Sequence, residues 1–536
     1  MIRFNKEDKI LANIARVIET RMNKKNIEAE LTLVLDPALA ELESKFEDGV
    51  ISGGAYPDIL YVAGKFLRNP GLENGHFKSF KPVCGLYWAT HNQGYAETAP
   101  IEELLEDIED EALWGMNIIE MWYDLAQHKI EESADFIERL LTLLRHAKSL
   151  GLKTALTVLA NEAFDDSPEE LRADWTCGHD GYTLNLNAHY HREICPSKKG
   201  GMEKIIEYRR QMLEAFKDAD PDYVGIGPYD QGGCTCTDCA PWGGNGYIRC
   251  VEALTPVIKE YFPNAKILMS TWYFGTFRKG DVSEFELLQK AIAEGRLEDV
   301  EYITSEPQVH PWPFEHSIGK KHIGFPEISM CGIFPWGGYG ATPVPMKIQN
   351  LWDANHDKLE GGFPYCEGFY EDINKAIVLR QYRDNQHASD TVKEYLAYEC
   401  GLEGELLDEV HAAVMAMEET HKRGWEPGHR YPIKTPDKIF DIEKTILKAH
   451  EQLPEQYKNC KKWRLFYYRA VIDASLARND FYRDDIVMGY FKEMIEMYHL
   501  YNANWYVKPD IMTDEKYGRP LTKDELKIIA LGGTID

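Results

Sequence analysis

The chain has 536 residues, a net charge of −28 and 44% hydrophobic residues. This length exceeds what one hydrophobic core supports, so we expect two or three domains. The negative charge argues against nucleic acid and anionic membranes as partners, because both are polyanions. The N-terminus has no apolar signal segment, and no stretch approaches about 20 uninterrupted apolar residues, so we expect a soluble, cytoplasmic protein. The eleven cysteines, an odd number, fit a reducing compartment better than a disulfide framework.

The first 80 residues carry their own pattern of elements. Apolar residues at helical spacing predict a helix over 8–22, followed by a strand over 31–35. A further strand over 46–51 and a helix over 58–67 complete a small α/β domain over 1–80, which ends at a linker near Pro70-Gly71. Nothing in this segment forms a catalytic constellation, so we expect it to serve in packing.

From Val83 onward the pattern changes to strand, polar loop and helix, repeated along the chain. The predicted strands are 84–89, 117–122, 154–159, 223–227, 266–270, 302–304, 322–326 and 361–365. Eight strands, mostly separated by helical patterns, predict a (β/α)8 TIM barrel over 81–371, with chemistry at the carboxyl ends of the strands. An open doubly wound sheet is the alternative, but the first strand lacks the glycine-rich turn of that fold.

After residue 371 the pattern becomes almost wholly helical. The predicted helices are 373–385, 390–400, 404–423, 437–452, 455–476 and 482–501. They predict a C-terminal helical bundle over 372–536. No flexible polar linker separates this bundle from the last strand, so we expect its first helix to hold the end of that strand in place.

Carboxylates follow six of the predicted strands. They are Asp124, Glu162, Asp230, Glu306, Glu327 and Glu367. Asp230 is the best catalytic candidate, because a helix cap would not need the Tyr-Asp-Gln-Gly-Gly sequence around it. We predict Glu306 and Glu367 as its catalytic partners by their place at the barrel end, with Glu327 in reserve. Asp124 and Glu162 are expected to be structural or to bind substrate.

Amides, histidine and aromatic residues accompany these acids. The predicted substrate-binding residues are His91, Asn92, Trp122, Asn161, Tyr229, Gln231, Trp242, Asn245, Trp272, Trp336 and Tyr365. Amides and histidine hydrogen-bond hydroxyl groups, whereas flat rings stack on the C–H faces of a pyranose. Glycine-rich phosphate cradles with Lys or Arg at the last strands are missing from the sequence. The combination favours an uncharged carbohydrate as the partner.

Three cysteines in the loop after the fourth strand have the spacing C-x-C-x-x-C: Cys234, Cys236 and Cys239. They could hold a structural zinc ion if a fourth ligand arrives, for which Cys250, Cys195 or a histidine are candidates. The alternative is a tight loop whose small thiols pack under the site. Catalysis itself is expected to require no cofactor.

The stretch PYDQGGCTCTDCAPWGGNGY resembles the Asn-Asp-Gly-Gly…Cys-x-Cys-x-x-Cys loop of barrel glycosidases that act on N-acetylglucosamine in N-glycans. Asp230 matches the aspartate of that loop, and Tyr229 stands where the family has asparagine. The wider layout is similar to that of hexosaminidases and α-glucuronidases, and 46–67 is similar to the strand and helix that close their N-terminal domain. Gln231 replaces the glutamate of the hexosaminidase Asp-Glu pair, which leaves the N-acetyl substrate and substrate-assisted catalysis open.

These observations predict a β-hexosaminidase-like glycoside hydrolase that is exo-acting on oligosaccharides or glycosides. One carboxyl group would protonate the leaving oxygen, and a second would act as nucleophile, as base or as orienter of an N-acetyl group. Two alternatives remain: a sugar lyase or isomerase on a barrel, which would normally need a metal or a Schiff-base lysine, and an inactive carbohydrate-binding protein. Whether the chain forms a homo-oligomer also stays open.

Overall fold

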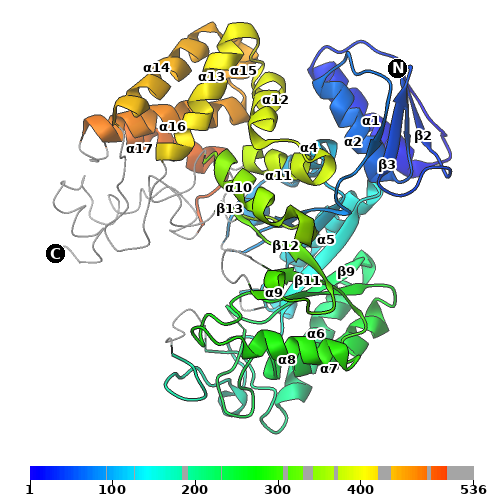
Figure 1. The fold of residues 1–536 in the computed structure, drawn as a ribbon, viewed down its shortest axis with the longest axis vertical. Helices are drawn as coiled ribbons and strands as arrows, with labels where there is room; N and C mark the ends of the chain where they lie inside the picture. Colours follow the sequence, from blue (N-terminus) through cyan, green and yellow to red (C-terminus); the bar gives the residue numbers. More distant parts are fainter. Residues whose placement is uncertain are drawn as a thin grey trace.

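The structure is a computed structural model of the chain, which describes residues 1–91, 93–125, 127–183, 191–230, 232–305, 312–329, 342–366, 372–420, 436–479 and 484–503. Figure 1 shows a barrel with a small N-terminal sheet and its helices on one side and a group of C-terminal helices on the other. Among the described helices, none has both the length and the apolar character needed to cross a membrane.

The N-terminal part is a five-stranded sheet with two helices, α1 (Lys9–Lys24) and α2 (Tyr56–Arg68). Its strands, in the order in which they pair, are β1 (Ile2–Arg3), β2 (Leu31–Leu35), β4 (Val50–Gly53), β3 (Glu43–Glu47) and β5 (Gly75–Lys78). The predicted single strand over 46–51 is wrong. A hairpin turn at Asp48-Gly49, with φ of 49° and 83°, splits this stretch into β3 and β4.

The eight predicted barrel strands are confirmed as one closed, parallel barrel. Their bounds are β6 (Val83–Trp88), β7 (Ile118–Trp122), β8 (Lys153–Leu159), β9 (Tyr223–Gly227), β10 (Lys266–Ser270), β11 (Val300–Ser305), β12 (Lys321–Gly324) and β14 (Leu359–Gly362). Two short strands, β13 (Glu327–Ser329) and β15 (Tyr365–Cys366), pair with each other just after β12 and β14. They form a separate two-stranded sheet that follows the carboxyl ends of β12 and β14, where the predicted chemistry lies.

Helices surround the barrel on its outside, as the repeated pattern predicts. They are α3 (Tyr95–Thr98), α4 (Ile101–Trp114), α5 (Ala134–Ser149), α6 (Gly201–Ala215), α7 (Gly246–Tyr261), α8 (Ser283–Ala293), α9 (Trp312–Glu315), α10 (Pro345–Asn355) and α11 (Asp372–Asp384). Helix α11 contacts both α4 and β6, so it packs on the barrel as the outer helix of the eighth strand. A domain boundary at residue 371 would therefore separate that strand from its helix.

The remaining helices pack beside this end of the barrel. They are α12 (Ala388–Cys400), α13 (Gly404–Met417), α14 (Pro436–Gln452), α15 (Glu455–Lys458), α16 (Lys461–Arg478) and α17 (Asp485–Met497). The predicted helix over 455–476 is two helices, α15 and α16, which meet at residues 459 and 460. Helix α14 packs on α13 and α16.

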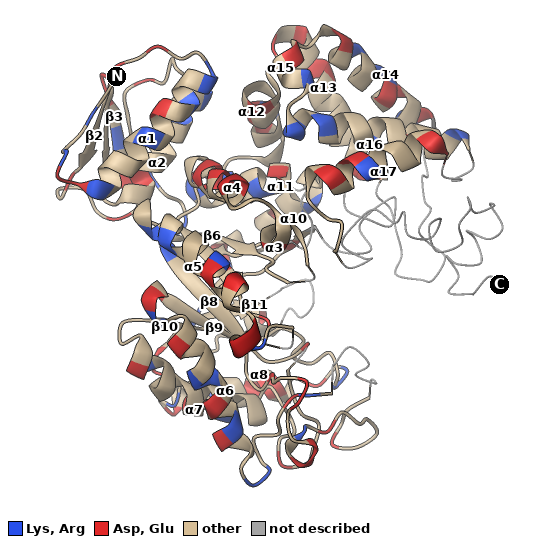
Figure 2. Cartoon of the chain, turned by 180° about the vertical axis from the view of Figure 1, so that it is seen from behind, with Lys and Arg blue, Asp and Glu red and all other residues tan. Residues whose placement is uncertain are grey.

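Helix α4 connects the three parts of the molecule. Figure 2 shows it as a strongly acidic helix. Arg21 of α1 donates from Nε to Asp110 at 2.6 Å. Lys462 of α16 lies 3.8 Å from the same carboxylate, and Lys375 of α11 lies 3.0 Å from Glu111. Basic residues from the N-terminal part, from α11 and from the C-terminal helices thus share one acidic helix of the barrel.

Candidate active site

The carboxyl end of the barrel carries a continuous group of aromatic side chains. Tyr87 of β6 stacks on Tyr365 of β15, with ring centroids 5.4 Å apart, and meets Phe325 edge to face at 5.6 Å. Phe325 lies 5.4 Å from Tyr365 and 6.3 Å from Trp272. Because these rings come from β6, from β15 and from the residues just after β10 and β12, they form a shared apolar lining near the barrel mouth.

His91 and Trp122 extend this aromatic lining along the ends of β6 and β7. The His91 ring lies 4.8 Å from Trp122 and 6.5 Å from Tyr87, measured between centroids. Thr90 joins the two strand ends, because its hydroxyl donates to the Trp122 carbonyl and accepts the Trp122 N–H at 3.1 Å. The structure thus brings together the predicted binding residues His91, Trp122, Trp272 and Tyr365.

Asp230 lies just after β9, where the loop 228–245 leaves the barrel. Its side chain is half-buried, and its backbone has a φ of 74°. This left-handed conformation is uncommon for a residue other than glycine. Such a conformation persists only where its surroundings fix the backbone. The loop 228–245 should therefore contain strong anchors.

Two predicted binding residues are such anchors. Asn161, at the end of β8, accepts the Gly233 N–H and donates to the carbonyls of Gly233 and Ile194 at 2.7 and 2.8 Å. The Trp242 indole donates to the carbonyl of Pro228, two residues before Asp230 in the chain. Both side chains have 0% exposed surface. Their polar atoms hold the loop, and the prediction that Asn161 and Trp242 contact a sugar stays a prediction.

Glu284 of α8 is an anchor that sequence reasoning missed. Its Oε1 accepts the Tyr229 hydroxyl at 2.6 Å and the Gly243 N–H at 2.7 Å, while its Oε2 accepts the Gly275 N–H at 2.7 Å. Burial raises the pKa of the Glu284 carboxyl. Tyr229 is also enclosed, and the Asn245 amide donates to two carbonyls within its own loop. Both predicted binding residues therefore shape the loop 228–245.

Glu120 is a second carboxylate that the sequence prediction missed. It lies inside the barrel on β7 and accepts the Thr157 hydroxyl. Opposite them is Gly225, where a Cβ atom would lie 2.1 Å from the Thr157 Oγ1 and 3.0 Å from the Glu120 Oε1, so only glycine fits. Burial raises the pKa of Glu120 to about 7. The sequence signal that could have identified Glu120 is a charged residue within an otherwise apolar predicted strand.

The other strand-end acids differ in their surroundings. Asp124 accepts the N–H of Gln127 at 3.2 Å and its side-chain amide at 2.5 Å, the arrangement of a turn cap. Glu162 is fully buried, and its carbonyl accepts from Arg209 at 3.1 Å. Glu327 is half-buried at the start of β13, in register with Tyr365 of the aromatic lining. This placement keeps Glu327 among the catalytic candidates.

Five predicted residues fall outside the part of the chain that the structure describes: Asn92, Gln231, Glu306, Trp336 and Glu367. Glu306 directly follows β11 in the chain, and Glu367 directly follows β15. Their roles as catalytic acids stay predictions.

The three cysteines of the predicted metal motif lie together with a fourth. Cys195 comes from the long connection between β8 and α6, and the ligand atoms of Cys195, Cys234, Cys236 and Cys239 all lie within 4.8 Å of one another. Cys250 is buried in α7 and is not one of this group. Of the three proposed sources of a fourth ligand, the geometry selects Cys195.

No protein-family model matches this chain, and no curated protein matches it by sequence. Solved structures do match its fold. A family 89 glycoside hydrolase from Clostridium perfringens, in complex with PUGNAc, has a TM-score of 0.61 and 12% identity over 92% of this chain and 65% of that chain. The chain therefore spans slightly less than two thirds of that hydrolase.

A second match is a GH138 enzyme that targets pectin rhamnogalacturonan II. Its TM-score is 0.56 with 11% identity, over 93% of this chain and 71% of that chain. The family 89 enzyme in complex with 2-acetamido-1,2-dideoxynojirmycin gives a TM-score of 0.62. At these identities the similarity establishes the fold, which this chain shares with these glycoside hydrolases over 92–93% of its length.

Proposed function

We propose that this protein is a glycoside hydrolase whose active site is the carboxyl end of the barrel. The observation that carries the proposal is the aromatic lining of Tyr87, Trp122, Trp272, Phe325 and Tyr365 at the barrel end from which the Asp230 loop departs. Aromatic faces suit the C–H surfaces of sugar rings, and carboxyl groups suit acid–base cleavage of a glycosidic bond. Active sites of this fold lie at the same end.

Asp230 is proposed as a catalytic carboxyl group, either acid or base. Its anchored left-handed backbone would hold the carboxylate in one orientation, which is what proton transfer requires. The second carboxyl group is proposed from Glu306, Glu327 and Glu367. Of these, Glu327 is placed in register with Tyr365. A separation of about 5–5.5 Å between the two acting carboxyls would indicate retention of configuration, and about 6.5–9.5 Å inversion.

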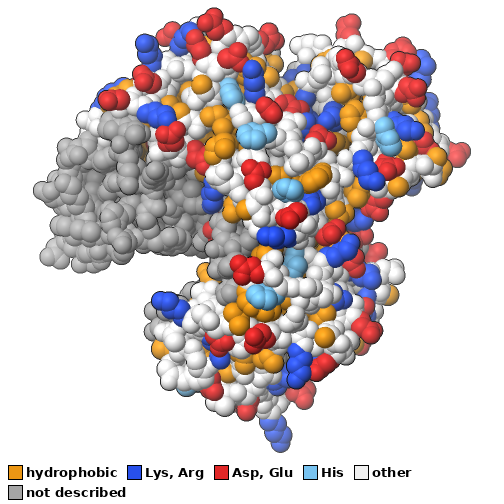
Figure 3. Space-filling view, in the orientation of Figure 1, with side chains coloured by type: hydrophobic (Ala, Val, Ile, Leu, Met, Phe, Trp, Pro, Cys, Tyr) orange, Lys and Arg blue, Asp and Glu red, His pale blue; other side chains and the backbone are white. Residues whose placement is uncertain are grey.

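The proposed substrate is an uncharged oligosaccharide or glycoside, attacked from its end. One matching structure is a complex with 2-acetamido-1,2-dideoxynojirmycin, and another is a complex of the family 89 enzyme with its substrate GlcNAc-alpha-1,4-galactose, so hexosaminides are the first substrates to test. On the face drawn in Figure 3, acidic and basic side chains of the described residues are interspersed and form no broad basic patch. That distribution agrees with a neutral partner better than with a polyanion.

A screen of nitrophenyl glycosides, with and without a short EDTA treatment, tests the proposal. Release of nitrophenol from at least one glycoside in both conditions supports a hydrolase. Nitrophenol release that EDTA removes and Mg²⁺ or Mn²⁺ restores would instead point to a metal-dependent lyase, whereas an isomerase would release no nitrophenol. Sugar binding by calorimetry without turnover on any glycoside would leave a carbohydrate-binding protein.

The Asp230→Asn substitution tests the residue assignment on whichever glycoside is cleaved. We expect kcat/KM to fall by at least ~100-fold, the usual effect of losing a general acid or base. The melting temperature should stay within about 2 °C, since one half-buried oxygen is exchanged for an isosteric NH2. Asp238→Asn is the matched control, because Asp238 is exposed in the same loop. Near-normal turnover by Asp230→Asn would make Asp230 structural.

A further inference from the structure

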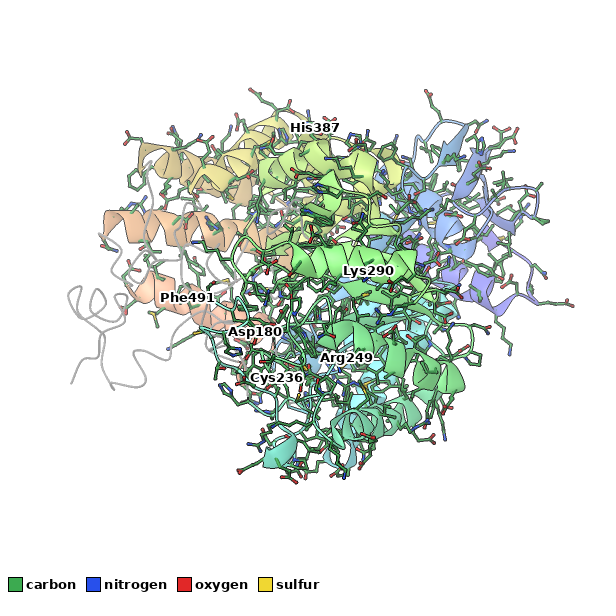
Figure 4. The ribbon with its side chains drawn as sticks, turned by 60° about the horizontal axis from the view of Figure 1, so that its bottom comes forward. Asp180, Cys236, Arg249, Lys290, His387 and Phe491 are labelled. Atoms are coloured by element: carbon green, nitrogen blue, oxygen red, sulfur yellow. The ribbon has the colours of Figure 1, made fainter. Side chains whose placement is uncertain are left out.

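Four cysteine thiols form one compact group beside the proposed active site. Cys234, Cys236 and Cys239 come from the loop 228–245, and Cys195 comes from the segment 160–200 between β8 and α6. Cys195, Cys234 and Cys239 are buried, whereas Cys236 is partly exposed. Figure 4 shows Cys236 near Asp180 of the segment 160–200 and Arg249 of α7, in agreement with the hydrogen bond from Thr237 to Asp180 and the contact of Arg249 with Cys239.

Two of the distances between sulfur atoms match the edges of a metal-centred tetrahedron. The Cys195 Sγ lies 3.8 Å from the Sγ atoms of Cys236 and Cys239. Zinc binds thiolates at about 2.3 Å, and a tetrahedron with that radius has edges of about 3.8 Å. A disulfide would instead require about 2.05 Å between two of the sulfurs. All four ligand atoms lie within 4.8 Å of one another, so one ion could contact each of them.

Hydrogen-bond donors surround the sulfurs, as they do around thiolate ligands in proteins. The Asp174 N–H donates to the Cys234 Sγ at 3.4 Å, and the Ser197 hydroxyl lies 3.0 Å from the Cys239 Sγ. Arg249 lies with its Nη2 3.7 Å from the same sulfur and donates to the Ser197 hydroxyl at 2.8 Å. The arginine also supplies positive charge where four thiolates and a divalent ion would leave a net charge of −2.

We propose that Cys195, Cys234, Cys236 and Cys239 bind one zinc ion in a closed, structural site. A protein site with four thiolate ligands has no open position for water or substrate, so the ion would not take part in the reaction. Tetrahedral sulfur sites also accept iron. The surrounding loops carry only this one four-sulfur group among the described residues, which fits a single ion.

The zinc ion would fasten two long connections of the barrel to each other. Asn161 already joins them close to the strands, through its bonds to Ile194 and Gly233. The four-cysteine site would join them again farther along the loop 228–245, at Cys234, Cys236 and Cys239. Asp230 lies four residues before Cys234, so the ion would restrict the loop that carries the proposed catalytic carboxylate. The site thereby acts on Asp230 through the backbone of loop 228–245.

Metal analysis of the full-length protein tests the proposal independently of activity. Purified protein should contain close to one equivalent of zinc, and replacement by Co²⁺ should produce the visible absorption of tetrahedral cobalt thiolate. Less than about 0.2 equivalents of any metal after zinc-supplemented expression would overturn the proposal, as would iron in place of zinc. A disulfide among these four cysteines, detected by mass spectrometry of the unreduced protein, would also overturn it.

Substitution separates these four cysteines from the others. Cys195→Ser should lower zinc content at least fivefold and reduce the melting temperature by roughly 5 °C or more, because a structural zinc contributes its binding energy to folding. Cys177→Ser is the matched control: Cys177 is exposed in the same segment 160–200 and should leave both values unchanged. Retention of one zinc by Cys195→Ser, or equal metal loss in both variants, contradicts the assignment of Cys195.

Should Cys195→Ser fail to fold, the intact protein still decides the question. The four thiols should resist alkylation until a chelator is added, while Cys177 reacts at once. The zinc proposal and the hydrolase proposal can fail separately. Bound zinc in a protein that hydrolyses no glycoside would support the metal site and contradict the proposed function. Glycoside hydrolysis by a protein without zinc would support the function and contradict the metal site.

Discussion

Loop 228–245 and helix α4 both connect distant parts of the chain, but they do so by different means. The loop is fixed by a few enclosed groups, each with several partners: Asn161, Trp242 and Glu284 have at most 1% exposed surface. Helix α4 is held by ion pairs from α1, α11 and α16, several of which reach the surface. A buried acceptor with three donors is costly to remove, whereas an exposed pair contributes little.

The difference predicts where single substitutions act. In the loop, removing one side chain should misplace Asp230 and its neighbours. At α4, the loss of one exposed charge should be tolerated, because the remaining pairs keep the three parts together. Only removal of a whole partner element should break that arrangement.

Removing the C-terminal helices is the largest such change. We expect truncation before Asp372 to give insoluble or inactive protein, because it takes away α11, whose Arg383 contacts Asp58 of α2 at 2.9 Å and whose Lys375 contacts Glu111 of α4. Soluble expression and glycoside hydrolysis are the measurements. A truncation after Asp384 keeps α11 and is the informative comparison. A soluble, active barrel without α11 would show that α11 and the helices after it are accessory.

Removal of the Glu284 carboxylate should be the most damaging single change in the loop anchors. Glu284→Ala leaves the Tyr229 hydroxyl and the N–H groups of Gly243 and Gly275 without their shared acceptor. With about 1–3 kcal/mol for each buried unsatisfied donor, we expect a loss of roughly 3 kcal/mol or more in the free energy of unfolding, measured in urea. Glu286→Ala, an exposed site on the same helix, should change it by less than about 0.5 kcal/mol. Equal losses in the two variants would refute the anchor role.

The barrel strands could be predicted because each is a short apolar run closed by turn or polar residues. Such a run is a local signal in the sequence. The predicted strand over 223–227, which Pro228 follows, has the same first and last residues as β9. The hairpin at Asp48-Gly49 was missed because the prediction of one strand over 46–51 merged two strands that only the turn separates. The division of 455–476 into α15 and α16 escaped for a similar reason, since apolar spacing continues across residues 459 and 460.

The site could be predicted only in part, because burial and partnership depend on the tertiary structure. Trp272 and Tyr365 were predicted to bind substrate, but Tyr87 and Phe325, which lie within predicted strands, were not, although they join the same aromatic lining. Tyr229 was predicted to bind substrate, because an aromatic residue in a glycine-rich loop can either contact a ligand or anchor the loop. Its partner Glu284 lies 55 residues farther along the chain, and no spacing rule links the two.

Glu120 extends the comparison to a buried acid within the barrel. Its pKa of about 7 in the folded protein lies above the usual carboxyl value of about 4.3. The folded chain therefore keeps a proton that the unfolded chain releases, and the contribution of Glu120 to stability falls by roughly 3 kcal/mol as pH rises from about 4.3 to 7. Glu120→Gln lacks this titration. We expect the free energy of unfolding in urea, taken as the variant minus the parent, to be roughly 3 kcal/mol larger at pH 8 than at pH 4.5.

The outcome that contradicts this prediction is a stability difference between the two proteins that is the same at both pH values. Measuring the difference, in place of either protein alone, removes the contribution of other buried acids. These include Asp107 and Glu111 of α4, whose pKa values burial raises to about 6 and about 7.

The smallest expected effect lies at the exposed edge of α4. Lys24 of α1 contacts Glu106 at 3.1 Å, and the two side chains are 64% and 46% exposed. Water and salt screen such a pair, so a double-mutant cycle with Lys24→Ala and Glu106→Ala should give a coupling free energy of about 0.5 kcal/mol or less, falling further in 0.5 M NaCl. Because Glu106 also lies 3.8 Å from Arg21, the cycle is needed to separate the Lys24 contribution from that second contact. A coupling above about 2 kcal/mol would mean that α4, like loop 228–245, depends on single contacts, and the distinction between the two regions would fail.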